Sequence, residues 1–337
     1  MITKALCGQI NGKDVYEFTV QNGNVTLQVM EYGATVHTLC YNGVDCVAGY
    51  DDLNGYIHGD SFQGATVGRY ANRIGGAAYT VNGETYRVDA NDNECNSLHG
   101  GAEGFYGKLF QGEELDDHTV AFSLFSPNGE GGYNGNLHLT VTFCVENDGV
   151  TITYDALCDQ DTVMNFTNHA YFTLGADSCK DIMLQLQADA ITPVDSLLIP
   201  TGEWMDVTDT PFDFRTPKPI GQDLEKSHPQ LALGGGYDHN FVLGQSKEWR
   251  ENVIIAVNPQ TGIRLTCSTD LPGVQLYTSN VLGEPVGKWG KPLVKHQAFC
   301  LETQFFPNTP NQSNFPSCMV KAEQPFTSVT RYELTQK

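Results

Sequence analysis

Short segments with alternating apolar and polar residues recur along the chain, and tight-turn dipeptides separate many of them. The clearest alternating segments span residues 25–29, 137–143, 150–154, 182–186 and 274–277. Asn-Gly or Asp-Gly pairs stand at residues 11–12, 22–23, 42–43, 82–83, 128–129 and 148–149. Alternation predicts half-buried strands, and these dipeptides favour hairpins because both turn positions need positive φ. The pattern therefore predicts a largely antiparallel β-protein.

Helical periodicity is weak throughout, and the best helix candidates are short, near residues 51–56 and 221–226. No internal repeat, low-complexity tract or linker divides the 337 residues, and large all-β folds often form one domain of such length. We expect residues 1–337 to form a single all-β domain, a large antiparallel β-sandwich with few short helices and long loops on one face.

The charge of the chain limits its partners. Nineteen Lys and Arg face 40 Asp and Glu, a formal net charge of -21, which repels nucleic acid and anionic membranes. No apolar run approaches the roughly 18 residues of a membrane span. We expect a neutral small molecule as the partner, no nucleic acid, no membrane, and a monomer or homodimer.

The cysteines and the N-terminus bear on location. Residues 1–11 lack a basic region followed by an apolar one, so no signal peptide is expected. The ten cysteines include no C-x-x-C pair, which favours reduced thiols and argues against zinc. A cytoplasmic location follows as an expectation.

Glu302 is the first candidate for chemistry. It follows the apolar run 298–301 and precedes a segment rich in Pro and Asn, residues 307–316, where regular structure must stop. A strand that ends in Glu before a rigid loop can direct one base into a cleft. The same residue could also be only a charge on an edge strand.

Two histidines lie in distinctive surroundings. His169 is flanked by Asn168 and the pair Tyr171-Phe172, and His99 precedes two glycines that let a ligand approach the backbone. Histidine is the commonest general acid or base because its pKa lies near neutrality. A lone histidine is more often structural: His99 could be a packed or surface residue, and His169 a core histidine with its hydrogen bonds satisfied.

Four further residues could hold a ligand. Asn72 and Arg73 stand in a loop rich in Gly and Arg, residues 68–76, and could donate hydrogen bonds to ligand oxygens. Asp238 follows a glycine run and could accept bonds from neighbouring sugar hydroxyls, while Gln275 offers an amide inside a strand. Solvated surface loops are the alternative for the first two and for Asp238.

Several cofactor and nucleophile motifs are missing. The chain has no H-E-x-x-H spacing, no G-x-G-x-x-G or Walker loop and no G-x-S-x-G elbow. We therefore expect no metal and no cofactor.

In combination these segments resemble the aldose 1-epimerases, or galactose mutarotases. The motifs that carry the resemblance are G-R-Y-A-N-R-I-G at residues 68–75, L-H-G-G at 98–101, N-H-A-Y-F at 168–172, Y-D-H-N-F at 237–241, L-P-G-V-Q-L-Y-T at 271–278 and E-T-Q at 302–304. The resemblance runs from about residue 64 to residue 317. It implies a β-sandwich of the galactose-mutarotase type, without cofactor or metal, that interconverts the α and β anomers of free hexoses such as glucose and galactose.

The resemblance also implies roles. Glu302 would be the base and His169 the acid, and both would act as the ring of the hemiacetal opens and closes. The residues that would bind the sugar are Asn72, Arg73, His99, Tyr171, Asp238 and Gln275. Three departures from the family pattern, Phe110, Thr173 and Phe305, leave the preferred sugar open.

Ring opening needs the anomeric hydroxyl to lose a proton while the ring oxygen gains one. Glu302 would therefore be ionised and His169 protonated at the same moment, which predicts a bell-shaped pH dependence. Three alternatives stay open: a sugar-binding or regulatory protein without chemistry, a glycoside-processing enzyme that uses Glu302 and Asp238, and an epimerase of phosphorylated hexoses, which would need an extra cationic cluster.

Overall fold

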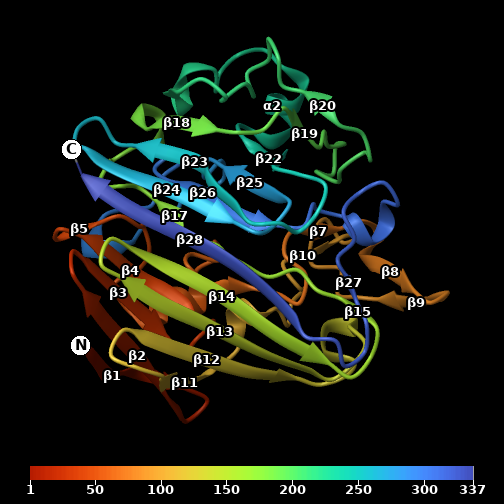
Figure 1. Cartoon of the computed structure of the whole chain (residues 1–337), viewed down its shortest axis with the longest axis horizontal. Helices are drawn as coiled ribbons and strands as arrows, with labels where there is room; N and C mark the ends of the chain where they lie inside the picture. Colours follow the sequence, from red (N-terminus) through yellow and green to blue (C-terminus); the bar gives the residue numbers. More distant parts are fainter. Residues whose placement is uncertain (337) are drawn as a thin grey trace.

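The computed structural model, which describes residues 1–336, is built from strands arranged in three main sheets (Figure 1). The largest is a nine-stranded antiparallel sheet. Its strands in spatial order are β11 (Gln111–Glu114), β12 (Thr119–Ser126), β13 (Leu137–Glu146), β14 (Gly149–Cys158), β28 (Phe326–Gln336), β24 (Ile263–Thr269), β23 (Arg250–Val257), β18 (Met183–Leu186) and β21 (Lys218–Pro219).

Two smaller sheets form the opposing layer. The first is five-stranded and runs in chain order through β1 (Ile2–Ile10), β2 (Lys13–Asn22), β3 (Val25–Met30), β4 (Thr35–Tyr41) and β5 (Val44–Asp45). The second is six-stranded, in the order β17 (Tyr171–Phe172), β26 (Phe299–Gln304), β25 (Gly273–Tyr277), β22 (Asp238–Val242), β19 (Ala190–Ile191) and β20 (Met205–Asp206).

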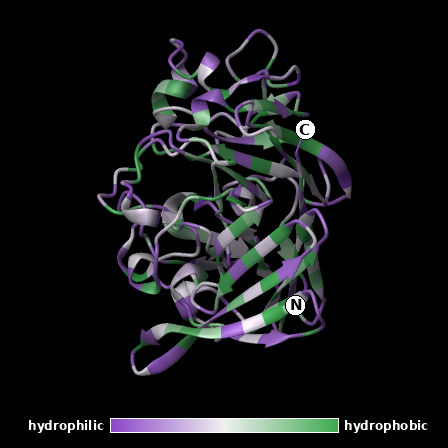
Figure 2. Cartoon of the chain, turned by 90° about the vertical axis from the view of Figure 1, so that its left-hand side faces the viewer, coloured by the Kyte–Doolittle hydropathy of each residue, from purple (hydrophilic) through white to green (hydrophobic). Residues whose placement is uncertain are grey.

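Contacts between the layers make the core of the sandwich. Strands β2 and β3 pack on β12 and β13, while the six-stranded sheet packs on β28. There the hydroxyl of Tyr332 donates to the carbonyl of Leu301 at 2.9 Å, and the hydroxyls of Thr303 and Thr330 lie 2.6 Å apart. Apolar and polar residues alternate along the strands (Figure 2), as along β13, whose apolar side chains are buried. This arrangement confirms the predicted β-sandwich.

Short strand pairs lie outside the three main sheets. They are β7 (Arg73–Ile74) with β10 (Ser97–Leu98), β6 (Thr66–Val67) with β16 (Thr167–Asn168), β8 (Ala78–Val81) with β9 (Glu84–Arg87), and β15 (Thr162–Val163) with β27 (Met319–Val320). The first two pairs bring loops from distant parts of the chain to one edge of the six-stranded sheet, where His99 and His169 follow β10 and β16 directly.

The predicted turns are confirmed at three sites. Asn11-Gly12, Asn42-Gly43 and Asn82-Gly83 all have positive φ at both residues and join paired strands. The pairs at 22–23 and 148–149 also lie at hairpins, but the turn residues there are 23–24 and 147–148. Asn128-Gly129 lies in the longer connection between β12 and β13.

The two α-helices among the described residues are short. Helix α1 (Leu53–His58) agrees with the first predicted helix and is capped by Asp52, whose side chain accepts from the amide of Gly55. The prediction over residues 221–226 is wrong, because that stretch holds only the end of a 3₁₀ turn, Ile220–Gln222. Helix α2 (Pro229–Gly234) begins later, where His228 caps the chain and Pro229 fits the first helical position.

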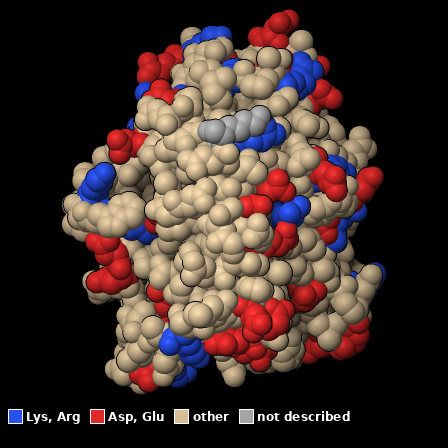
Figure 3. Space-filling model, turned by 60° about the vertical axis from the view of Figure 1, so that its left-hand side comes forward, with Lys and Arg blue, Asp and Glu red and all other residues tan. Residues whose placement is uncertain are grey.

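Acidic side chains are spread over the face in Figure 3, with basic ones between them, as the net charge requires. No helix among residues 1–336 is long and apolar enough to cross a membrane.

Candidate active site

Three neighbouring strands present polar side chains on one face of the six-stranded sheet. Glu302 on β26 pairs directly with Gln275 on β25, which in turn pairs with Asn240 on β22. The next side chain, that of Thr303, points the other way, where its hydroxyl lies 2.6 Å from that of Thr330 on β28. Because side chains alternate along a strand, Glu302 must point away from the sandwich core.

Asp238 lies two residues before Asn240 on β22, so it shares this face. The amide of Gln275 donates to its Oδ1 at 2.7 Å, and Nη1 of Arg73 lies 3.9 Å from its Oδ2. Burial raises the pKa of Asp238, while Arg73 and the bond from Gln275 act to lower it. Three of the expected sugar-binding residues therefore form one connected group.

His169 reaches the same face from the neighbouring edge. It lies between β16 and β17, and β17 pairs with β26. Its Nε2 is 3.6 Å from Oε1 of Glu302, and the two side chains are only 5% and 3% exposed. His169 Nδ1 and Glu302 Oε2 are buried without a protein partner, so each has hydrogen-bonding capacity left for a ligand.

Burial shifts the acidity of this pair in opposite directions. Burial raises the pKa of Glu302 to about 8. The negative charge of Asp238 adds to this rise, and the positive charge of Arg73 opposes it. Burial lowers the pKa of His169 to about 4. Both shifts follow from the cost of a charge in a low-dielectric site. Between these values the pair holds one proton, which resides mainly on the carboxyl group.

His99 comes next to the pair from the loop after β10. Its ring centroid is 5.2 Å from that of His169, and burial lowers its pKa well below the usual value. Its Nδ1 accepts from the backbone N–H of Asn72 at 3.2 Å. The neutral ring therefore carries its hydrogen on Nε2 and can donate it to a ligand oxygen.

The pairing of β7 with β10 also positions Arg73 and the preceding residue, Asn72. The side chain of Asn72 accepts from the backbone N–H of Arg73 at 2.8 Å, and Asn72 itself has φ 64°. Asn tolerates this left-handed conformation better than most residues. The turn orients Arg73 toward Asp238.

Tyr171 adjoins the acid–base pair, and its ring stacks on that of His169 with centroids 5.1 Å apart. The eight residues expected at the site thus lie in one neighbourhood.

Sequence reasoning missed two neighbours of this group. Phe62 packs on His99 and His169, with ring centroids 5.0 and 6.0 Å away, and has φ 55°. Asp92 accepts from Nε of Arg73 at 3.2 Å. Neither residue lies in a periodic segment or a recognisable motif. The only sequence signal is the charged, Asn-rich run that surrounds Asp92.

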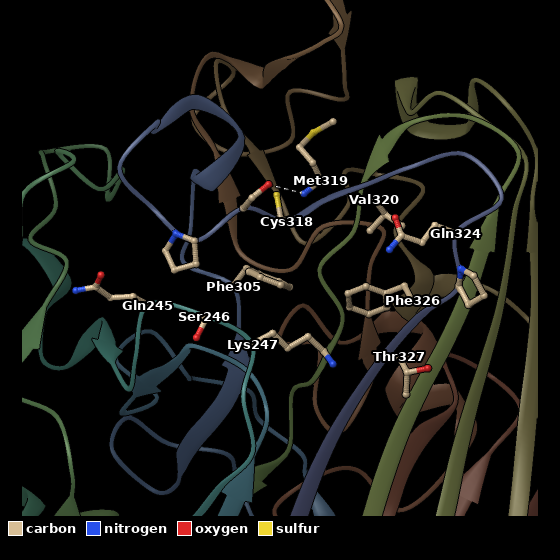
Figure 4. A pocket seen from close by; sticks show the side chains of 13 residues that line it. Gln245, Ser246, Lys247, Phe305, Cys318, Met319, Val320, Gln324, Phe326 and Thr327 are labelled. Atoms are coloured by element: carbon tan, nitrogen blue, oxygen red, sulfur yellow. Dashed lines mark hydrogen bonds between the residues drawn. The ribbon is translucent and has the colours of Figure 1, made fainter.

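The three departures from the family pattern lie outside this group. Phe110 is buried near Phe105, and Thr173 lines another pocket beside Trp289. Phe305 lies in a separate pocket of about 410 Å³, where its ring lies near Lys247 and Phe326 (Figure 4). That pocket contains none of the eight expected residues.

One cluster has the composition of a metal site. Single ligand atoms of His99, His169 and Glu302 lie within 4.8 Å of one another. The bond from Asn72 to Nδ1 of His99 leaves a hydrogen on Nε2, where a metal would need a lone pair. These residues therefore fit a hydrogen-bonded ligand better than a cation.

Known proteins match this chain over most of its length. A family model described as aldose 1-epimerase matches residues 16–333. The galactose mutarotase of Bos taurus is 36% identical over 345 residues, covering 99% of this chain and 98% of its own length. An aldose 1-epimerase of Haemophilus influenzae is 35% identical over 309 residues, covering 87% of each chain. The crystal structure of a galactose 1-epimerase from Lactobacillus acidophilus superimposes with a TM-score of 0.90 at 26% identity, covering 100% of this chain and 99% of the other.

Proposed function

The chain belongs to the aldose 1-epimerase family, and on that premise we propose how it interconverts the α and β anomers of free hexoses such as glucose and galactose. Glu302 and His169 move the two protons of ring opening and closure. The observation that carries this proposal is the buried approach of His169 Nε2 to Glu302 Oε1, 3.6 Å apart, beside the linked polar side chains of Gln275 and Asp238.

Glu302 acts as the base toward the anomeric hydroxyl. Its free Oε2 has no protein partner and can accept that hydroxyl. A carboxylate with a pKa raised to about 8 is a stronger base than an ordinary one, so its proton transfer has a larger driving force. Positioned proton transfer of this kind contributes about 10²–10⁴ in rate.

His169 acts as the acid toward the ring oxygen. The open aldehyde then rotates about its C1–C2 bond and closes on the other face, with the two groups in reversed roles. The reactive form, with Glu302 ionised and His169 protonated, has the same number of protons as the dominant neutral form. It is the less populated of the two because burial disfavours both charges.

Several polar side chains would hold the sugar. Asp238, already linked to Gln275 at 2.7 Å, accepts hydrogen bonds from neighbouring hydroxyls, and the amide of Gln275 contributes another. Arg73, Asn72 and His99 donate further hydrogen bonds to the sugar. Tyr171 and Phe62 provide aromatic surface against the apolar face of the sugar ring.

The proposal extends to the domain organisation, location and partners of the chain. We propose one domain over residues 1–337, a cytoplasmic location and a monomer or homodimer that binds neither nucleic acid nor membrane. The net charge of -21 supports the lack of anionic partners. All ten cysteines are free among the described residues, which fits a reducing compartment.

Polarimetry tests the function directly. Freshly dissolved α-D-galactose and α-D-glucose change rotation slowly without a catalyst, and the protein should accelerate the approach to the same final value. Equal rates with active and heat-inactivated protein for both sugars would contradict the proposal. Release of reducing sugar from a glycoside would point to hydrolysis in its place.

A further inference from the structure

Arg73 is held between two carboxylates. Its Nε donates to Oδ2 of Asp92 at 3.2 Å, and its Nη1 lies 3.9 Å from Oδ2 of Asp238. The side chains of Arg73, Asp92 and Asp238 are each less than 15% exposed, so solvent screens these charges only partly. Asp238 belongs to the proposed sugar site, whereas Asp92 has no role there so far.

The position of Asp92 is fixed by its own loop. Its backbone N–H donates to the carbonyl of Asn96 at 2.9 Å, and its carbonyl accepts the N–H of Asn96 at 2.9 Å. Its second oxygen accepts from the side chain of Asn93 at 3.2 Å. Strand β10 starts at the next residue, Ser97, and pairs with β7, which carries Arg73. The carboxylate is therefore held in place against the guanidinium.

The summed charge of the site does not favour an anionic ligand. Among the described residues gathered there, Arg73 is the one permanent cation, and it faces Asp92 and Asp238. With Glu302 protonated, this set has a net charge of about -1 at neutral pH by simple counting of ionised groups. Without Asp92, Arg73 and Asp238 alone would balance.

We propose that Asp92 is a specificity-determining and positioning residue, whose charge makes the site net negative so that it accepts neutral hexoses and rejects hexuronates. The inference rests on the proposed function. Because Nε is bonded to Asp92, the guanidinium presents its terminal N–H groups to Asp238 and the sugar. The added negative charge repels any anionic group bound beside Arg73 and Asp238.

The test compares kcat/KM for D-galactose and D-galacturonate by polarimetry at pH 7. Asp92→Asn keeps an oxygen that can accept from Nε of Arg73 but removes the charge. We expect kcat/KM for galactose to fall only about threefold, mostly through KM, as a charge-assisted bond becomes a neutral one. The galacturonate-to-galactose ratio should rise at least about tenfold, since one unit charge within several ångströms supports a change of that size.

Glu94→Gln is the matched control. Glu94 is exposed in the same loop, and its replacement changes the net charge by the same amount without touching Arg73. Its ratio should stay at the wild-type value. Asp92→Ser gives a second neutral variant, and Asp92→Glu should retain the wild-type selectivity.

An unchanged ratio in both neutral variants, or an equal rise in Glu94→Gln, would overturn the proposal. A purely structural role of Asp92 would lower both activities together and leave the ratio constant. Failure of the proposed function is a different result, because the wild-type protein would then not accelerate mutarotation of galactose at all.

Discussion

Nε2 of His169 lies 3.6 Å from Oε1 of Glu302, and the same burial pushes their acidities in opposite directions. At neutral pH the two side chains therefore hold one proton between them. In this state one side chain can give a proton to the sugar while the other takes one, without exchange with solvent. The pair therefore still holds one proton after each turnover and can act on either anomer.

Replacing Glu302 with Gln should remove nearly all mutarotation. The amide keeps the size of the side chain but cannot take a proton, so the loss should be at least about 100-fold. Polarimetry measures the loss, and calorimetric titration with galactose should show binding largely retained. Glu113→Gln, at an exposed position on β11, should keep full activity. More than about a tenth of wild-type activity in Glu302→Gln would exclude Glu302 as the base.

The pH dependence of kcat/KM should be a bell between about 4 and about 8. Below about 4 both groups hold a proton, so no base is free, and above about 8 neither holds one, so no acid remains. These limits belong to the pair as a whole. A profile that is flat from pH 4 to pH 9 would contradict the shared proton.

The two histidines should respond differently to the same substitution. In His169→Asn the weak remaining activity needs only ionised Glu302, so it should rise through about pH 8 and not fall again. His99→Asn should lower activity but keep the bell, because His99 binds and orients the sugar. If His99→Asn loses the alkaline decline and His169→Asn keeps it, the two roles are exchanged.

Asp238→Asn and Arg73→Ala should mainly weaken sugar binding. Each removes one partner of a charge-assisted hydrogen bond, at a cost of about 1.5–3 kcal/mol, and KM should rise accordingly. Steady-state kinetics with galactose measure the effect. A variant with wild-type KM and kcat would place that residue outside the site.

Dialysis against a strong chelator should leave activity unchanged. The cluster of His99, His169 and Glu302 could attract a metal, but the hydrogen that Asn72 fixes on Nε2 of His99 opposes coordination. Activity lost on chelation and restored by one divalent ion would require a metal in the mechanism.

Sequence patterns predicted the architecture well where the cause is local. Asn11-Gly12 and Asn42-Gly43 form the expected turns because their positive φ depends on the two residues alone. The prediction at residues 221–226 failed because a tertiary contact decides that segment: the turn Ile220–Gln222 packs on the turn Cys179–Asp181, and the N–H of Ile220 donates to the carbonyl of Ile182 at 2.9 Å.

The site was harder to derive from local pattern. All six residues of β26 are buried, so alternation could not show which face Glu302 takes. The orientation of Glu302 follows from the contact of its neighbour Thr303 with β28 and from the pairing of Glu302 with Gln275. Phe62 and Asp92 reach the site through long-range contacts, which no single-sequence pattern records.

The direct pairing of Glu302 with Gln275 across two strands has a practical consequence. A slip of one residue in β26 would turn Glu302 into the sandwich and bring Leu301 or Thr303 to the face that carries Gln275. A misaligned molecule would therefore be inactive, with no intermediate turnover. The specific activity of a preparation should therefore be proportional to the fraction of molecules in which β26 and β25 are correctly paired. After dilution from denaturant, activity should recover at the rate at which this strand pair forms.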